Sequence, residues 1–341
     1  MQSYVEPALT DAEGRALWLA LFEELKRRRL LAPAASGALA RLALLGALLA
    51  AALALAWTAG GALALGAYAA LALLLAQFAF AGHDAGHGSL ARTAAGNRAL
   101  GQVAMTLVTG LAFDEWIARH RAHHLHCQDE ARDPDLAVDL VVSLTAASRR
   151  AKGRVGRFLT RGQAVHVWAL SLLFGHSQRL LSQAAALRHP VRHRADAAML
   201  AAHFALWFAV PCAWLGVPVG AAMLAYLAPL TLLGPYLAAI FWVNHVGMPL
   251  IREPARFSFF ERQVVTSRTL AVPRALDWAF GGLNYQVEHH LFPQVPSRRL
   301  REAHSAVRRH FERRGLDYPL SSWAEAARAV ARHLRRIAKG A

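Results

Sequence analysis

The sequence predicts an all-α integral membrane protein with four transmembrane helices in two hairpins, interfacial helices and a helical cytosolic cap. The 341 residues are 55% hydrophobic and only 18% charged, which is too apolar for an ordinary soluble domain. Two stretches, 42–83 and 197–251, contain no Asp, Glu, Lys or Arg. Because a bilayer core needs roughly 20 apolar residues per helix, each stretch can hold two spans.

The formal net charge of +16 is distributed asymmetrically. Arginines concentrate in the N-terminal segment, the middle segment and the C-terminal tail, whereas the tight connections near Gly60 and Pro218 carry none. This positive-inside pattern places the three basic segments in the cytoplasm, where they suit anionic lipid headgroups better than nucleic acid. We expect a single membrane domain over 1–341, made of an amphipathic cytosolic segment 1–37, membrane hairpins 38–251 with a cytosolic segment 83–196, and a cytosolic cap 252–341.

The first element is an N-terminal helix. Thr10 and Glu13 have the spacing of a capping box, in which each side chain satisfies a free amide of the first turn. Apolar residues gather on one side of the helix, so it is expected to lie on the membrane surface. Pro33 ends it. These apolar residues are Leu17, Trp18, Leu21, Phe22 and Leu25.

The other elements follow from hydropathy. Residues 99–113 are apolar but short for a full crossing, so they are expected to be re-entrant or to lie at the surface. Residues 165–174 are expected to be interfacial. The expected spans are 42–57 and 62–80 in the first hairpin and 198–215 and 221–243 in the second, and a last amphipathic helix is expected at 323–337.

Three histidine clusters indicate a metal centre assembled from distant segments. The first two clusters have helical spacing that puts their members on one face. The third is an adjacent pair whose side chains diverge by about 100° on a helix and could reach two metals. Imidazole suits iron, zinc and copper, and seven imidazoles imply more than one ion. The clusters are His83 and His87; His120, His123 and His124; and His289 and His290.

Further residues are candidates near this centre. His245, at the cytosolic end of the last span, is either an eighth ligand or a helix-terminal histidine near carbonyls. Gln286 could bind through its side-chain oxygen or through a water. Asp133 and Asp135 could accept hydrogen bonds from ligand imidazoles or shape a turn around Pro134. The other candidates for such supporting contacts are Asp84, Asn244 and Glu288, and the histidines interpreted as structural are His126, His166, His176 and His203.

The clusters HDAGH, HRAHH and QVEHH, set between two pairs of spans, resemble the membrane fatty acid desaturases. The stretch GGLNYQVEHHLFP resembles their front-end and acyl-lipid branch, where Gln commonly replaces the first His of the third box. The resemblance runs from about residue 81 to residue 318. It implies a non-haem di-iron centre at the cytosolic membrane face, held by the seven clustered histidines and His245. Such an enzyme would use O2 and two electrons to remove two hydrogens from adjacent methylenes of an acyl chain, releasing water.

The resemblance also implies partners. The sequence has no His-Pro-Gly-Gly haem motif of a fused cytochrome b5, so a separate ferredoxin or free cytochrome b5 is the expected electron donor. Arg119, Arg121 and Arg132 either dock an acidic donor or a substrate headgroup, or are simply solvated. The abundance of Ala, and of Arg over Lys, suggests a GC-rich genome, and we expect a multi-pass protein of a bacterial inner membrane.

Two other functions remain open. A related di-iron membrane enzyme could hydroxylate or ketolate a carotenoid, an alkane or another lipid, because the same oxidant can return oxygen to the carbon. A non-catalytic metal-binding membrane protein, such as a transporter, would place ionisable ligands along a path inside the spans. The uncharged stretches contain no carboxylate, which favours a site at one face.

Overall fold

The computed structural model describes residues 5–35, 37–137 and 141–340. Helices dominate this part of the chain, and its two strands are three residues long each. Four of its helices are long and apolar enough to cross a membrane, which confirms the predicted all-α membrane protein. They are α2 (Ala38–Thr58), α3 (Gly61–Gly86), the helix Arg194–Trp214, and α12 (Val219–His245).

The chain forms two compact units. The span unit comprises Pro33–Ala118 and Leu170–Leu237, and the histidine unit comprises Met1–Ala32, Arg119–Ala169 and Ala238–Ala341. The helices α5 (Phe113–His126) and α12 each contribute several residues to both units. The expected single domain stays a prediction.

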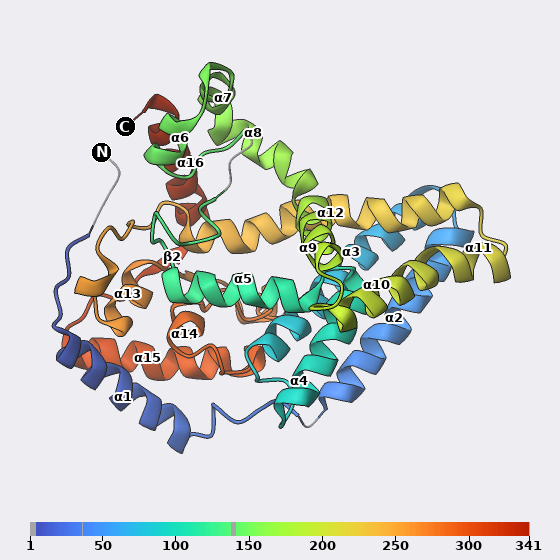
Figure 1. Ribbon diagram of the computed structural model, residues 1–341. Helices are drawn as coiled ribbons and strands as arrows, with labels where there is room; N and C mark the ends of the chain where they lie inside the picture. Colours follow the sequence, from blue (N-terminus) through green and yellow to red (C-terminus); the bar gives the residue numbers. More distant parts are fainter. Residues whose placement is uncertain (1–4, 36, 138–140, 341) are drawn as a thin grey trace. The chain divides into compact units, whose positions relative to one another are not determined.

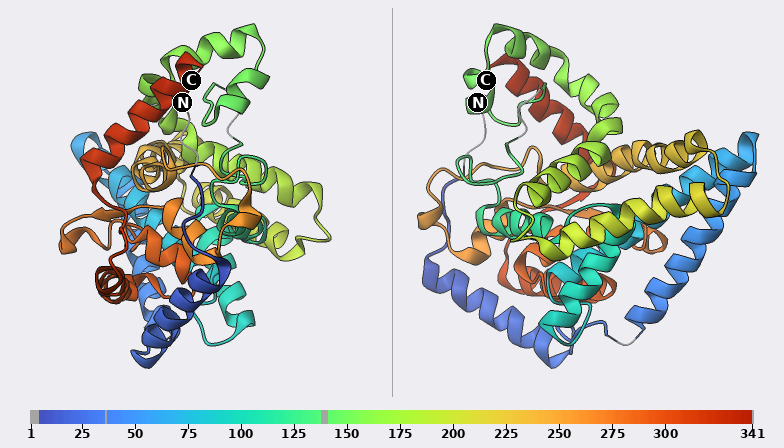
Figure 2. Two further views of the ribbon diagram at one scale, coloured as in Figure 1. Left: turned by 90° about the vertical axis from the view of Figure 1, so that its left-hand side faces the viewer. Right: turned by 45° about the vertical axis from the view of Figure 1, so that its right-hand side comes forward.

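In the span unit, α2 and α3 form the first predicted hairpin (Figures 1 and 2). They turn at Gly60 and Gly61, and Gly61 has a φ of 57°, which suits a residue without a Cβ. Small and aliphatic side chains from α2, α3 and the first half of α12 share one core. The helix α3 continues beyond the predicted residue 80 to Gly86, so the first histidine cluster lies at a helix end.

The remaining elements of the span unit include the helices of the second hairpin. Residues 99–113 form parts of α4 and a π-helix that stops at Gly110, and this segment is not among the four candidate spans. The helix Arg194–Trp214 consists of α10, a π-helical stretch and α11. In chain order the further elements are α4 (Ala94–Gly101), η1 (Gln102–Thr109), η3 (Ser171–Leu173), α9 (Phe174–Arg188), α10 (Arg194–Phe204), η4 (Ala205–Ala209) and α11 (Val210–Trp214).

The histidine unit is built from short helices around a separate apolar core. Its elements, in addition to the ends of α5 and α12, are α1 (Asp11–Arg27), α6 (Ala146–Ala151), α7 (Arg154–Leu159), η2 (Thr160–Gly162), α8 (Gln163–Leu170), η5 (Pro254–Arg256), α13 (Phe259–Val265), β1 (Thr269–Ala271), η6 (Arg274–Leu276), α14 (Gln286–Leu291), η7 (Ser297–Arg299), α15 (Leu300–Arg314), β2 (Leu320–Ser322) and α16 (Trp323–Lys339). The strands β1 and β2 pair in parallel, and the sequence analysis did not predict this pairing.

The apolar side of α1 packs against protein. The predicted capping box of Thr10 and Glu13 is present, but Leu17, Leu21 and Leu25 are buried in one core with side chains of α13, α14 and α15. In Figure 1, α1 runs alongside α15. The expected membrane-surface position of this face was therefore wrong. Hydrophobic periodicity predicts only that one face of a helix is shielded from water, and it does not distinguish shielding by lipid from shielding by protein.

Candidate metal centre

The histidine unit brings together histidines from three helices. The end of α5 carries His120, His123 and His124, the last residue of α12 is His245, and α14 carries His289 and His290. The turn before α14 requires glycine, because Gly282 has a φ of 77° and a Cβ on it would lie 2.6 Å from the Ser297 carbonyl oxygen. This close approach sets the direction of the helix that presents the last histidine pair.

Three of these histidines converge through their Nε2 atoms. The Nε2 atom of His124 lies 3.1 Å from that of His120 and 3.1 Å from that of His289. An imidazole that lacks a proton on Nε2 offers a lone pair there, so one metal ion bound by all three Nε2 atoms would account for this convergence. Two nitrogens bound at right angles to one ion at about 2.1 Å would lie about 3 Å apart. The spacing therefore fits a metal site, which we call group A.

The other three histidines form group B together with a cysteine. The ligand atoms of His123, Cys127, His245 and His290 all lie within 4.8 Å of one another. The structure thus divides the adjacent pair on α14, placing His289 in group A and His290 in group B. The two groups are in contact, because the rings of His124 and His290 stack at 4.3 Å.

Hydrogen bonds to Nδ1 orient all three histidines of group B. Nδ1 of His123 lies 2.9 Å from Asp133 Oδ1, that of His290 lies 3.0 Å from Gln263 Oε1, and that of His245 lies 3.0 Å from the Thr266 carbonyl oxygen. Each acceptor favours the tautomer with the proton on Nδ1 and the lone pair on Nε2, and such contacts to the outer nitrogen are usual for metal-binding imidazoles.

Cys127 is one residue near this centre that the sequence analysis did not predict. Its Sγ lies 3.5 Å from His245 Nδ1, and the side chain is fully buried. Burial by itself would raise the pKa of the thiol, but His245 and His123 outweigh it and lower that pKa to about 6. The spacing of four residues from His123 was the available signal, since Cys127 directly follows the end of α5 and residues four apart share a face of a helix.

Asp133 contacts both a candidate ligand and the backbone of the following turn. Besides its contact with His123, its carboxylate accepts the backbone N–H groups of Gln128 at 2.8 Å and of Asp135 at 2.9 Å, which shapes the turn after α5. The pKa of Asp133 is lowered, because these hydrogen bonds and the contact with His123 outweigh burial. Burial opposes the charge of His123, yet Cys127, Asp135 and Asp133 together raise its pKa well above 6.5.

Asn244 and Gln286 link α12 to α14. The Asn244 amide donates to Gln286 Oε1 at 3.1 Å and to the Leu283 carbonyl at 3.0 Å. The Gln286 amide nitrogen lies 2.9 Å from His245 Nε2. Gln286 therefore contacts a candidate ligand from the position at which a third-box histidine was considered.

Glu288 turns towards the sheet, and its contacts support α14. Its carboxylate accepts hydrogen bonds from Tyr318 at 2.5 Å and from Thr269 at 3.0 Å, and lies 3.1 Å from His304 Nδ1. Burial and the neighbouring Glu288 raise the pKa of Tyr318 well above 10, so the phenol remains a donor. Among the described contacts of Glu288, none is to one of the eight candidate ligands.

The first histidine cluster belongs to the span unit. His83 lies in the last turn of α3 and His87 caps it, and their rings are 4.8 Å apart. Asp84 is buried, with Oδ1 3.9 Å from His83 Nδ1. Packing is tight here, since a Cβ on Gly82 would lie 2.4 Å from Met105 and one on Gly86 would lie 2.5 Å from Ile117. The segment is therefore closely packed within its own unit.

Two of the histidines interpreted as structural have full or partial hydrogen bonding inside the span unit. His203 is bound through Nδ1 to the Leu107 carbonyl at 2.8 Å and through Nε2 to the Tyr226 hydroxyl at 3.0 Å. His176 contacts Thr231 at 2.9 Å.

In the histidine unit, Arg119 forms an ion pair with Asp135 and Arg132 forms one with Asp129, so both of these arginines already have a partner of opposite charge.

The donor set fits a metal such as iron. Six imidazoles occur in two adjoining groups, and imidazole is a good ligand for iron. Three of the rings are held in one tautomer by buried acceptors. Sequence spacing could not reveal Gln263 or Thr266, because neither belongs to a motif and each lies more than a hundred residues from α5 in the chain.

Fold and site together define an integral membrane protein with a histidine-rich candidate metal centre. A family model described as fatty acid desaturase matches residues 56–321. The chain therefore belongs to the fatty acid desaturase family.

Curated relatives agree with this family. The chain is 28% identical over 281 residues to the Delta(8)-fatty-acid desaturase 2 of Arabidopsis thaliana, covering 79% of this chain and 62% of that protein. It is 27% identical over 285 residues to the Acyl-lipid (9-3)-desaturase of Borago officinalis, covering 79% and 62%. A Delta 8-(E)-sphingolipid desaturase of Kluyveromyces lactis is 27% identical over 286 residues, covering 78% and 49%. The chain thus spans about half to three-fifths of the length of these relatives.

Proposed function

We propose that this protein is an O2-dependent fatty acyl desaturase with a di-iron centre. His120, His124 and His289 would hold one iron ion, and His123, His245 and His290 the other. His83 and His87 are proposed as further ligands because of their motif. The observation that carries the proposal is the convergence of the three Nε2 atoms of group A at 3.1 Å. The names of the relatives support desaturation as the reaction.

The bound iron ions would supply the oxidising power needed to remove two hydrogens from adjacent methylenes of an acyl chain, with O2 as co-substrate. The residues of this chain hold the imidazoles in place. Asp133, Gln263 and the Thr266 carbonyl keep protons on the outer nitrogens. The burial of His289 and His290 keeps bulk water away from the inner ones, which strengthens electrostatic interactions at the site.

The proposal includes a partner and a location. A separate electron donor, a ferredoxin or free cytochrome b5, would deliver two electrons for each double bond. The positive-inside distribution of arginine supports a cytosolic position of the site. The bacterial inner membrane stays a prediction from composition.

The test is the fatty acid profile of a host that expresses the protein together with an electron donor. We expect a new unsaturated fatty acid, located by double-bond derivatisation and gas chromatography, in cells with the wild-type protein. The His124→Ala variant should abolish it, because His124 contacts both other members of group A. The control is His176→Gln, which removes a histidine that contacts Thr231 and should leave the product unchanged.

Other results would contradict the proposal. A hydroxylated or ketolated lipid that depends on His124 would show that the centre transfers oxygen instead. Unaltered lipids from a wild-type protein that contains two iron ions and receives electrons would argue against acyl desaturation.

A further inference from the structure

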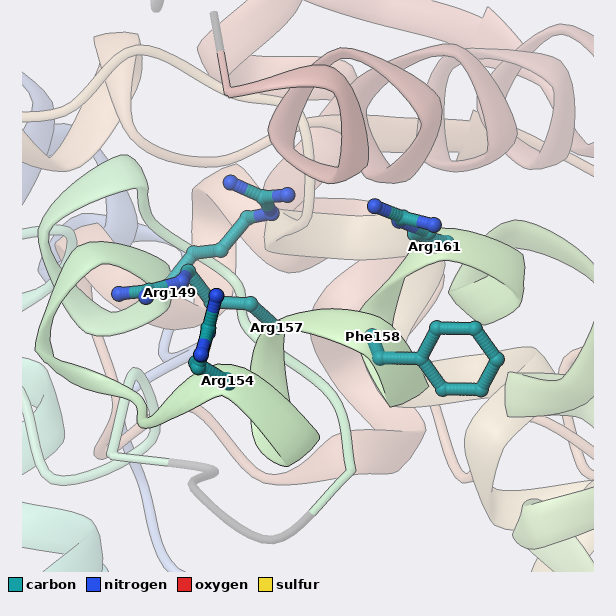
Figure 3. Close-up of a pocket in the computed structure, with 5 residues that line it drawn as sticks. All are labelled: Arg149, Arg154, Arg157, Phe158 and Arg161. Carbon is teal, nitrogen blue, oxygen red and sulfur yellow. The ribbon is translucent and has the colours of Figure 1, made fainter.

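A strongly basic pocket lies in the histidine unit, apart from the residues of the two histidine groups. It has a volume of about 340 Å³ and is lined by four arginines and one phenylalanine (Figure 3). The lining comes from α6, α7 and η2. The residues are Arg149, Arg154, Arg157, Phe158 and Arg161.

The charges of this pocket are not neutralised by the part of the chain that the structure describes. None of its four arginines forms an ion pair with a described carboxylate. Arg157 donates to two backbone carbonyls, those of Arg150 at 3.4 Å and Lys152 at 2.9 Å. The Nε atom of Arg149 is buried and lacks a hydrogen-bond partner among the described residues. Four neighbouring cations and an unsatisfied donor together favour a bound anion.

Exposed apolar side chains occur in the lining of the pocket and close to it in the chain. Phe158, which lines the pocket, is 63% exposed, and its neighbour Val155 on α7 is 73% exposed. Val165 at the start of α8 is also 73% exposed. Large apolar side chains beside arginines are typical of segments that lie in the headgroup region of a membrane, where each kind of side chain finds its own environment.

A contact between α8 and α12 within the histidine unit indicates how deep the segment from α7 to α8 lies relative to the membrane surface. Trp168 on α8 packs against Trp242 on α12 with ring centroids 6.0 Å apart. Trp242 lies three residues before the end of α12, which is one of the four candidate spans. Tryptophan is enriched at the membrane–water interface. The segment that continues from α7 into α8 therefore lies at the level of the lipid headgroups.

We infer that this pocket binds the phosphate-bearing headgroup of an anionic membrane phospholipid. Guanidinium groups bind phosphate oxygens through paired, charge-assisted hydrogen bonds. The exposed side chains of Val155 and Phe158 contact the lipid next to its headgroup. A free phosphate would use only the arginines, whereas a lipid uses Phe158 and Val155 as well.

The test measures lipid selectivity of the full-length protein in proteoliposomes. Electron paramagnetic resonance of spin-labelled phosphatidylglycerol and phosphatidylcholine reports the fraction of each lipid that the protein immobilises. We expect phosphatidylglycerol to associate about fivefold more strongly than phosphatidylcholine, the factor that corresponds to about 1 kcal/mol for one cation at an anionic lipid surface. The variant R149Q/R154Q/R157Q/R161Q should lose this preference.

Two further variants distinguish a site from general charge. The matched control R274Q/R298Q/R313Q/R314Q removes four exposed arginines elsewhere in the histidine unit and should keep the preference. Phe158→Ser should reduce it about threefold while leaving the four arginines in place, because about 0.6–0.8 kcal/mol of apolar contact is lost. Thermal unfolding and metal content verify that each variant is folded.

Several outcomes would overturn the inference. Equal loss in the two four-arginine variants would mean that net charge alone selects the lipid. Displacement of phosphatidylglycerol by inorganic phosphate, but not by chloride at equal ionic strength, combined with no effect of Phe158→Ser, would identify a free-phosphate site. Unchanged lipid selectivity, with loss of electron transfer from the donor in the pocket variant alone, would identify the pocket as a docking site for that protein.

Discussion

Among single residues, the acceptors on the outer ring nitrogens have the largest consequence for the site. A histidine binds a metal through the nitrogen that carries the lone pair, and a hydrogen bond on the other nitrogen selects it. Gln263 contacts two of the histidine clusters, because Oε1 lies 3.0 Å from His290 Nδ1 while Nε2 donates to the His124 carbonyl at 2.9 Å. One buried amide thus joins the second histidine cluster to the third.

Gln263→Ala is expected to weaken iron binding by about 10–100-fold, the usual effect of removing such a supporting contact. The loss follows because His290 would no longer be held in one tautomer. Iron retained against a competing chelator measures the effect. Gln183→Ala is the matched control, since Gln183 is another buried glutamine that donates to a backbone carbonyl, that of Gly110 at 2.8 Å. Equal iron retention in the two variants would disprove the role of Gln263.

The separation of His289 and His290 into two groups leads to a second expectation. His289→Ala removes a ligand of group A only, and His290→Ala a ligand of group B only. Each single variant should therefore bind close to one iron ion per chain, and the double variant close to none. Elemental analysis of the purified protein gives these numbers. Complete loss of iron in both single variants would instead indicate one tightly coupled site.

Among the helices, small residues permit the closest contacts in the span unit. A Cβ on Gly234 of α12 would lie 2.0 Å from the Ser171 carbonyl oxygen, and one on Gly175 of α9 would lie 2.9 Å from the Leu230 carbonyl oxygen. The two glycines thus let the start of α9 approach α12 at backbone distance. Membrane helices use small residues in this way because lipid supplies no hydrophobic force between them.

Gly234→Ala is expected to destabilise the protein by about 1–3 kcal/mol, the usual cost of inserting a group into a filled space. The obstacle is backbone and cannot move aside as a side chain could. Gly220→Ala lies on the same helix with open space around it, and it should be neutral or slightly stabilising. The midpoint of thermal unfolding in detergent compares the two. A similar midpoint for both variants would contradict the close contact.

For the whole molecule, charge and span number together predict the topology in the membrane. The four candidate spans return the chain to its starting side twice. The basic segments lie before the first span, between the hairpins and after the last span. A cytosolic position of all three is consistent with both features, and it places all the histidine clusters on one side.

Reporter fusions test this topology in a bacterial host. Alkaline phosphatase needs disulfides that form only outside the cytoplasm, so it should be active when fused after residue 59 or residue 216 and inactive after residue 150. Green fluorescent protein should be fluorescent at either terminus. An active phosphatase after residue 150 would place the middle segment, and the second histidine cluster with it, on the opposite side.

Hydropathy and the spacing of the histidines were sufficient to predict that the protein is a helical membrane protein and to predict its family. They were sufficient because a span and a helix face are local properties, written in 20 or fewer consecutive residues. The predicted spans differ from the observed helices mainly at their ends, as in α3, which continues to Gly86. The three histidine clusters were visible for the same reason.

Contacts between distant segments could not be read from local patterns. The division of the histidines into groups A and B, the place of Cys127, the bridge through Gln263 and the protein contacts of α1 all depend on how separate helices pack. Periodicity shows that a side chain is covered but does not identify its neighbour, because the neighbour is chosen by the packing of the whole unit. Only the tertiary structure decided these features.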